Sequence, residues 1–360
     1  MSAPRVNFVA REGFMRLAKV FVPVALLAIP MSATSHAAVD EPFYKGKTVQ
    51  FIIASAAGGG FDSQSRLIAR HLGDALAGSP SVVPQNMPGA GSIRAADHLY
   101  FTAAKDGTVI GMIDPGVYNS QLLGEPRIRF DTAKFTWIGR MVNNSPVVYT
   151  WHESPIHSAA DLFTKEAIIA ASGQTPRLNY LALNTVLHTR IKTITGYSGA
   201  GISSIAMERG EVHGLSQPWS VLKLTKGDWI DQKKIIPILQ TGAESHPELP
   251  HVPRMIDLAK NDEDRKLFEF FALPSLIGHS VIAPPEIPAE RTAELRVAFQ
   301  KMLRAPKFLE EVEKSQTDLA PLTGEELQKF MAEGVTYPPS VIERAKAITA
   351  LDAKEAENTK

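Results

Sequence analysis

Two glycine-rich segments in the first third of the chain hold the residues whose types and spacing best suit chemistry. The first glycine segment, Ala57–Asp62, has the sequence AGGGFD, and the second glycine segment, Asn86–Ser92, has the sequence NMPGAGS. Glycine lets the backbone turn sharply and lets a ligand come close to it. Where such a turn opens a helix, the first N–H groups are unpaired and carry a partial positive charge. These segments therefore predict backbone binding of a carboxylate or a phosphate.

The spacing within the chain excludes three better-known glycine motifs. A P-loop requires Lys and then Ser or Thr after its last glycine, whereas Phe61 and Asp62 follow here. A dinucleotide-binding fingerprint requires a glycine where Ser63 stands. A serine-hydrolase elbow requires G-x-S-x-G, which the stretch 196–199 does not fit. A tight turn in which Asp62 caps the helix, without any ligand, remains open as the alternative.

The elements that must position these segments alternate between strands and helices. Apolar β-branched runs predict strands, and apolar residues spaced along one helical face predict helices. The predicted strands are Thr48–Ile53, Val82–Val83, Thr108–Ile113, Val147–Trp151, Ala167–Ala171 and Ile235–Leu239. The predicted helices are Asp62–Leu76, Leu178–His188, Ala289–Leu303, Gly324–Met331 and a charged helix from Ser340 onward. This alternation predicts an α/β protein with mostly parallel sheets.

The first 37 residues have the order of a secretory signal peptide. Four basic residues precede the apolar run Val20–Ala33, and Ser35-His36-Ala37 supplies the small residues that a signal peptidase recognises. The run is shorter than the ~20 apolar residues of a membrane-spanning helix. We expect cleavage after Ala37 and a periplasmic mature protein. Met15 is an alternative initiator, and an uncleaved membrane anchor is the alternative fate of the apolar run.

Composition narrows the function classes. The 360 residues contain 38 basic and 38 acidic side chains, and a balanced charge argues against nucleic acid as a partner. Cys is absent, which excludes disulfides, thiol catalysis and thiolate metal sites. The ten His residues lack metal-ligand spacing, so we expect neither a metal nor another cofactor. The sequence offers an oxyanion site but no clear nucleophile and base, so we expect no enzyme activity.

The order of several short motifs resembles one known family, the receptors of tripartite tricarboxylate transporters, also called Bug-type or TctC-like solute-binding proteins. The family's first loop reads Pro-Gly-Gly-x-x-Asp, with Ala57 here in place of the proline, and its second reads Asn-x-Pro-Gly-Ala-Gly-Gly, with Ser92 in place of the last glycine. Further matches, from Tyr44 to about Leu322, are Asp106-Gly107-Thr108, Phe130-Asp131-Thr132, Ala171–Gln174, Gly196–Gly199, Gly210-Glu211-Val212, Thr241-Gly242 and Leu249–Pro253.

The resemblance implies a two-lobed type II periplasmic-binding-protein fold with the ligand in a cleft between the lobes. The predicted strands near Val142–Tyr149 and Ile236–Thr241 indicate the two crossings between the lobes. After a signal peptide over residues 1–37, we therefore expect a first lobe from 38–141 and 245–360 including a helical tail, and a second lobe from 142–244. The implied ligand is a small di- or tricarboxylate or an aromatic carboxylate. The implied partners are the membrane subunits of a tripartite transporter, and we expect a monomer. A sensor that presents its ligand to a membrane histidine kinase and an exported α/β hydrolase remain alternatives.

The resemblance also implies which residues contact the ligand. Arg66 and Arg94 are possible cations beside them, or simply solvated, and Trp219 is expected in the core. Ser172 and Thr175 could instead cap a helix, and Tyr197 could instead pack in a turn. The implied ligand-binding residues are Ser55, Gly58, Gly59, Gly60, Phe61, Asp62, Gly89, Ala90, Gly91, Ser92, Ser172, Gly173, Gln174, Thr175, Tyr197, Ser198 and Gly199.

Overall fold

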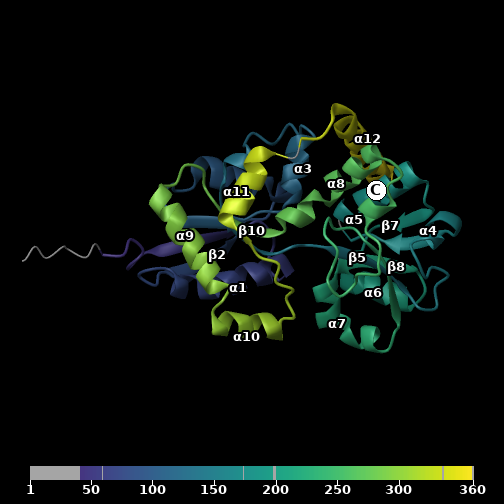
Figure 1. Ribbon diagram of the computed structural model, residues 1–360, viewed down its shortest axis with the longest axis horizontal. Helices are drawn as coiled ribbons and strands as arrows, with labels where there is room; N and C mark the ends of the chain where they lie inside the picture. Colours follow the sequence, from purple (N-terminus) through teal and green to yellow (C-terminus); the bar gives the residue numbers. More distant parts are fainter. Residues whose placement is uncertain (1–40, 59, 173, 198–199, 335, 359–360) are drawn as a thin grey trace, which may run out of the picture. The chain divides into compact units, whose positions relative to one another are not determined.

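Two mixed β-sheets, each covered by helices on both faces, carry the fold (Figure 1). The computed structural model describes residues 41–58, 60–172, 174–197, 200–334 and 336–358. The expected signal peptide and its cleavage site lie outside the described residues. Residues Pro42–Lys360 form one compact unit. Within the described part of the chain, no helix is both long and apolar enough to cross a membrane.

The first sheet contains both glycine segments at the ends of its strands. Its strand order is β11-β4-β10-β3-β1-β2. These strands are β1 (Thr48–Ile53), β2 (Ser81–Asn86), β3 (Val109–Met112), β4 (Thr136–Val142), β10 (His279–Ala283) and β11 (Leu322–Thr323). One face packs against α1 (Gly60–Ala75), α9 (Ala289–Met302) and α10 (Pro306–Lys314), and the other against α2 (Ile93–Asp97), α3 (Gly116–Leu122) and α11 (Gly324–Glu333).

The second sheet has the strand order β7-β6-β8-β5-β9. Its strands are β5 (Pro146–Trp151), β6 (Ala167–Ala170), β7 (Ile191–Ile194), β8 (Gly214–Pro218) and β9 (Ile235–Gln240). The helices in this part of the chain are α4 (Asp161–Thr164), α5 (Gln174–Leu187), α6 (Ala200–Glu208) and α7 (Trp219–Asp231). Trp219 is buried with α6 and α7 against one face, as the sequence predicts.

The expectation of mostly parallel sheets is wrong, although the α/β class is confirmed. In the described strands, β1 pairs in parallel with β2 and β3, and β6 pairs in parallel with β7 and β8. The remaining ladders, which join β10 and β11 to the first sheet and β5 to β8 and β9, are antiparallel. The physical reason is the route of the chain. Strand β5 enters the second sheet directly from β4 without a crossover helix, and β10 enters the first sheet from the second through α8; both run against their neighbours.

The chain passes between the sheets at two places. It leaves β4 at Val142 and enters β5 at Pro146. After β9 it returns through a 3-10 turn, η4 (Met255–Leu258), and α8 (Asp262–Ile277) to β10. The last helix, α12 (Pro339–Asn358), packs on both α5 and α8, where Arg177 makes two hydrogen bonds of 2.7 and 2.6 Å to Asp352 (Figure 1). The last helix, α12, thus contacts α5, which follows β6 of the second sheet, and α8, which leads to β10 of the first sheet.

Helix α1 forms because its sequence separates an apolar from a polar face. Leu67, Ile68 and Leu72 are buried against the first sheet, while Ser63 and Arg70 on the opposite side are exposed. The same packing fixes the position of the turn that precedes the helix, because α1 cannot shift without exposing this face. The packing of α1 on the first sheet therefore fixes the position of the first glycine segment.

Candidate functional site

Both glycine segments lie at one edge of the first sheet. Ile53, the last residue of β1, pairs with Asn86 of β2 on one side and with Met112 of β3 on the other. The three strands are parallel, so their carboxyl ends share an edge, and this edge is where open α/β sheets bind ligands. The first glycine segment follows β1, and the second begins at the end of β2.

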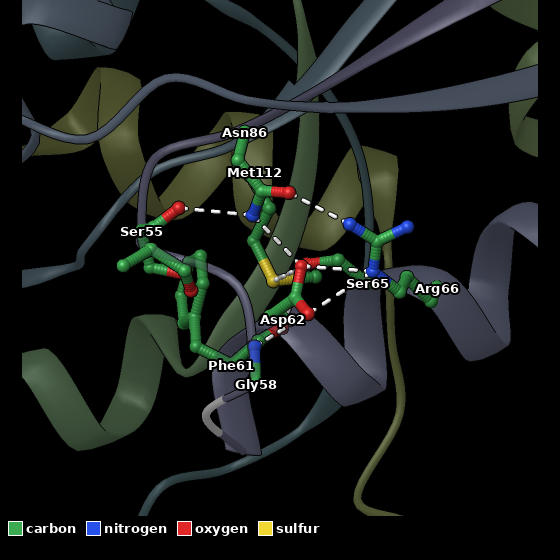
Figure 2. A network of polar contacts seen from close by, with 9 residues as sticks. Ser55, Gly58, Phe61, Asp62, Ser65, Arg66, Asn86 and Met112 are labelled. Atoms are coloured by element: carbon green, nitrogen blue, oxygen red, sulfur yellow. Dashed lines mark hydrogen bonds and ion pairs between the residues drawn. The ribbon is translucent and has the colours of Figure 1, made fainter.

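A buried carboxylate, Asp62, ties the two segments together (Figure 2). It accepts hydrogen bonds of 3.0 Å from the Gly58 N–H, 3.0 Å from Arg66 Nε and 2.8 Å from Asn86 Nδ2. Arg66 also donates to Asn86 Oδ1 at 2.7 Å, and Asn86 Nδ2 donates to the Ser55 carbonyl at 3.0 Å. The turn after β1 and the last residue of β2 thus form one hydrogen-bonded unit.

This network sets the charge state and the role of Asp62. Burial opposes ionisation, but hydrogen bonds from Arg66, the Gly58 N–H and Asn86 lower the pKa of Asp62 to about 2. The carboxylate is therefore ionised at neutral pH and is paired with Arg66. Asp62 lies in the first turn of α1 and reaches back to the amide before the helix, so it stabilises the turn. The first N–H groups of α1, from Gly60 onward, have no acceptor within the helix.

The second glycine segment has an unusual backbone. Four successive residues have positive φ: Gly89 at 140°, Ala90 at 47°, Gly91 at 60° and Ser92 at 74°. For a residue with a Cβ this left-handed region costs about 1–2 kcal/mol, and such strain collects at ligand-binding sites. Successive backbone N–H groups in positive-φ turns can form a concave nest for an anion. Gly89, Ala90 and Gly91 are all exposed.

Ser92 anchors the strained segment to the neighbouring strands. Its hydroxyl donates to the Ala54 carbonyl at 3.2 Å and accepts from the Asp114 N–H at 3.3 Å. Ala54 follows β1 and Asp114 follows β3. The Ser92 side chain therefore joins the second glycine segment, which begins at the end of β2, to the ends of these two strands. The family motif has glycine where Ser92 stands. The serine provides the buried hydroxyl that makes these two hydrogen bonds.

In the second sheet, the sequence-predicted residues follow β6 and β7. Ser172 is half-buried, and its hydroxyl lies 2.8 Å from that of Ser203 on α6. Gln174 and Thr175 are exposed at the start of α5, and Tyr197 is half-buried and packs beside the apolar cluster of this sheet. Gly59, Gly173, Ser198 and Gly199 lie outside the described residues.

Beneath these positions, the second sheet holds buried polar atoms without partners. Within the described residues, the hydroxyls of Tyr149 and Tyr180 and Nε2 of Gln217 have no hydrogen-bond partner. Burial raises the pKa of both phenols above the usual value. Tyr149 faces α6 and Tyr180 belongs to α5, so the two phenols lie on opposite faces of the sheet. A buried polar group without a partner is costly, so these atoms mark places where a water or a ligand atom fits.

Two residues at the edge of the first sheet were not predicted from the sequence. Asp114 follows β3, and His279 opens β10 beside the first glycine segment, with its ring 4.9 Å from that of Phe61. The sequence could have indicated Asp114 as a site residue, because it directly follows the predicted strand Thr108–Ile113 and therefore lies at the carboxyl end of the sheet. His279 had no such signal, since β10 was not predicted. In the described part of the chain no three His, Asp or Glu side chains gather as a metal site would require.

Comparison with known sequences gives a distant relative. No protein-family model matches the chain. A curated protein of Cupriavidus necator, described as a UPF0065 protein in the gbd 5' region, is 23% identical over 349 residues, which span 94% of this chain and 97% of that protein. The similarity therefore extends over both sheets.

Solved structures share the fold at low sequence identity. A TctC solute-binding protein from Polaromonas aligns with a TM-score of 0.62 at 16% identity, covering 84% of this chain and 98% of its own. An R. palustris protein with adipate gives 0.57 at 19%, covering 84% and 96%, and MatC from Rhodopseudomonas palustris with bound malate gives 0.56 at 18%, covering 84% and 98%. These structures confirm the type II periplasmic-binding-protein fold and the predicted resemblance to the TctC-like proteins.

Proposed function

We propose that this chain is a periplasmic solute-binding receptor that captures a small carboxylate for a tripartite tricarboxylate-type transporter. The observation that carries the proposal is the pair of glycine segments at one sheet edge, linked by Asp62, Arg66 and Asn86. Two similar folds bind adipate and malate, which supports a carboxylate as the ligand class. The protein acts by binding and release, without catalysis.

The ligand's carboxylate accepts hydrogen bonds from backbone N–H groups of both glycine segments. Because Arg66 is already paired with Asp62, the positive potential at this edge comes from the N–H groups and the start of α1. Residues 172–175 and 197–199 contact the ligand from the second lobe. Contacts to both lobes stabilise a closed state, which is the state that the membrane subunits recognise.

In the proposed domain layout, the first lobe combines residues 38–141 and 245–360 and the second contains 142–244. The membership of the strands supports it, because β5 to β9 form one sheet and the other described strands form the other. Residues 1–37 direct export and are removed. N-terminal sequencing of protein expressed with its own leader should then begin at Ala38 or Val39, and retention of Val20–Ala33 would contradict export by cleavage.

The variant Gly60→Asp tests the anion site directly. Gly60 has an ordinary φ, and a Cβ there meets no atom within 4 Å, so the side chain fits without strain. An aspartate in the first turn of a helix is favourable, so the fold should persist. Its charge would occupy the anion position. Losing one or two charge-assisted hydrogen bonds should weaken carboxylate binding at least about tenfold.

Two matched variants control this experiment. Gly60→Ala adds the Cβ without the charge, and Gly227→Asp adds the charge at an equally open glycine on α7. Calorimetry with adipate, malate and a panel of aromatic carboxylates, alongside circular dichroism, should show loss of binding in Gly60→Asp alone. If a carboxylate binds wild type and folded Gly60→Asp equally, the glycine segments are ordinary turns.

A further inference from the structure

His279 lies beside the first glycine segment, against Phe61. Its ring makes an edge contact with Phe61, and Nδ1 is hydrogen-bonded to Gln64 Oε1, one turn further along α1. The Gln64 oxygen can only accept, so the proton of the neutral imidazole sits on Nδ1 and Nε2 carries a lone pair. Among the described residues Nε2 has no hydrogen-bond partner, and His279 is half-buried.

The surroundings of His279 leave its ring without a compensating charge. Burial alone lowers the pKa of His279 to about 4, so the empty protein holds it neutral at pH 7. On α1, the charge of Asp62 is paired with Arg66. On β4, beside β10, Arg140 donates to two backbone carbonyls and lies 3.9 Å from Glu244.

Asp114 is a further titratable group near this position, in addition to His71 on α1, which pairs with Glu311. It follows β3, which pairs with β10, and it lines a water-sized hollow of about 10 Å³ together with Ser280, the neighbour of His279. Burial raises the pKa of Asp114, and one hydrogen bond from the Gly116 N–H opposes that effect. Asp114 is thus a rival proton acceptor near His279, and an experiment has to separate the two.

We infer that His279 is a specificity-determining residue that contacts the bound carboxylate through Nε2 and takes up a proton when the ligand binds. This inference rests on the proposed receptor function. A neutral Nε2 presents a lone pair, which repels a carboxylate oxygen, whereas the protonated nitrogen donates a hydrogen bond to it. The proton comes from the solvent, and no bond in the ligand changes. The site thereby gains a formal positive charge only when it is occupied.

The linkage fixes the direction of the pH effect. An opposite charge within about 4–6 Å shifts a pKa by about 1–3 units, so the pKa of His279 should rise from about 4 to roughly 5–7 in the complex. Binding then tightens as pH falls through the pKa of the complex. For a bound pKa of about 6–7, affinity should increase roughly 4- to 20-fold between about pH 7.5 and about pH 5.5. Over that range a single ligand carboxyl with a pKa of ~4 remains ionised. The second carboxyl of a diacid titrates higher because of the first negative charge, so the share of His279 is the difference between wild type and His279→Gln.

Calorimetry of the full mature chain with adipate and with malate tests the inference. For a bound pKa of about 6–7, titrations near pH 6 in buffers of different ionisation enthalpy should show uptake of roughly 0.5–0.9 proton per ligand. His279→Gln, which keeps a neutral polar group there, should bind more weakly near pH 5.5 and lose the pH dependence and the uptake. His71→Gln controls for histidine loss, because His71 pairs with Glu311. Asp114→Asn should retain the uptake if His279 is the acceptor.

The outcomes separate the two proposals. Binding without proton uptake, or uptake that persists in His279→Gln, would overturn the role of His279 and leave the receptor function intact. Uptake lost in Asp114→Asn but kept in His279→Gln would assign the proton to Asp114 instead and equally overturn the inference. If neither acid nor any carboxylate of the wider panel binds the folded wild-type chain, the receptor function falls and this inference falls with it.

Discussion

The candidate contacts of the two sheets differ in how their polar groups are satisfied. In the first sheet, Asp62, Arg66 and Asn86 pair with one another and with the backbone of both glycine segments. In the second, Ser172 meets another hydroxyl, while Tyr149 and Gln217 hold polar atoms without partners. In the first region, which consists of Asp62, Arg66 and Asn86, the side chains pair with one another, whereas in the second region, around Ser172, Tyr149 and Gln217, buried polar atoms lack partners.

This difference indicates that the two regions contribute differently to ligand binding. A network that is fully paired during folding fixes the positions of the N–H groups, so little order is lost when a carboxylate binds there. Buried hydroxyls and amides without partners favour ligands that can form hydrogen bonds with them, so they discriminate among ligands. The first region should therefore determine that an anion binds, and the second should contribute, together with His279, to the choice among anions.

The largest expected effect comes from removing the carboxylate of the first region. Asp62→Ala leaves the Gly58 N–H and the Arg66 guanidinium without their acceptor. Because the Arg66 side chain is 38% exposed, water compensates part of the loss, and we expect a cost of about 2 kcal/mol in unfolding free energy together with weaker carboxylate binding. Ser172→Ala, which removes one neutral hydrogen bond, should cost less than ~1 kcal/mol.

Urea denaturation and calorimetry of both variants measure these effects. Equal losses of stability would remove the distinction between the two regions. Asp62→Asn is the matched variant, because it retains the shape of the side chain while it removes the charge and replaces one acceptor oxygen with an NH2 donor. Its stability should lie between those of wild type and Asp62→Ala.

The elements of the first region were largely predictable, and its chemistry was not. The strand at Thr48–Ile53 and the helix that follows it have clear apolar patterns, so the sequence predicted both, and the position of the first glycine segment with them. The i, i+4 spacing of Asp62 and Arg66 gave a signal for their ion pair. Asn86 could join them only through the pairing of β1 with β2, which is a long-range contact that no local pattern encodes.

The second region was harder to predict because its strands depend on their neighbours. Strand β8 has the sequence GLSQP, whose Gly, Ser, Gln and Pro have little strand propensity, and it forms because β5 and β6 pair with it on both sides. Strand β10, which carries His279, was also missed. The glycine motifs predicted a carboxylate ligand through the family resemblance, whereas the unpaired atoms of Tyr149 and Gln217 appear only in three dimensions.

The second expected effect is a pH dependence of stability that only the first region shows. The folded pKa of Asp62, about 2, lies below the ordinary value of 3.8. Its contribution is therefore complete above about pH 4 and is lost as pH falls through 2. Allowing for the exposure of Arg66, the loss should be about 1–2 kcal/mol. The unfolding free energies of wild type and Asp62→Asn should converge over this interval, and a constant difference between them would contradict the assignment.

A third effect concerns the unpaired atoms of the second region. Tyr149→Phe removes a buried hydroxyl that has no hydrogen-bond partner, so it should leave stability within about 1 kcal/mol of wild type or increase it. If the hydroxyl serves discrimination, the variant should change the ratio of adipate to malate affinity while retaining carboxylate binding. Thermal denaturation and calorimetry measure both quantities. A loss well above 1 kcal/mol would show that a buried water or a side chain satisfies the hydroxyl.

The smallest effect tests the strain of the second glycine segment. Ala90 has a φ of 47°, where its Cβ is unfavourable, so Ala90→Gly removes about 1 kcal/mol of strain. Glycine also increases the freedom of the unfolded chain, which opposes the gain. The net result should be a stabilisation of roughly 0.5 kcal/mol. Carboxylate affinity should nevertheless fall, because a more flexible segment holds its N–H groups less firmly in the binding geometry.

Lys233→Gly provides the matched comparison in the second region. Lys233 is exposed with a φ of 54° just after α7, away from the residues proposed to contact the ligand. It should show a similar small stabilisation and no change in affinity. Higher stability with lower affinity in Ala90→Gly alone would show that the left-handed backbone of the second glycine segment serves binding. Unchanged affinity in both variants would mean that this conformation is only a turn, and that the first region owes its anion site to the start of α1.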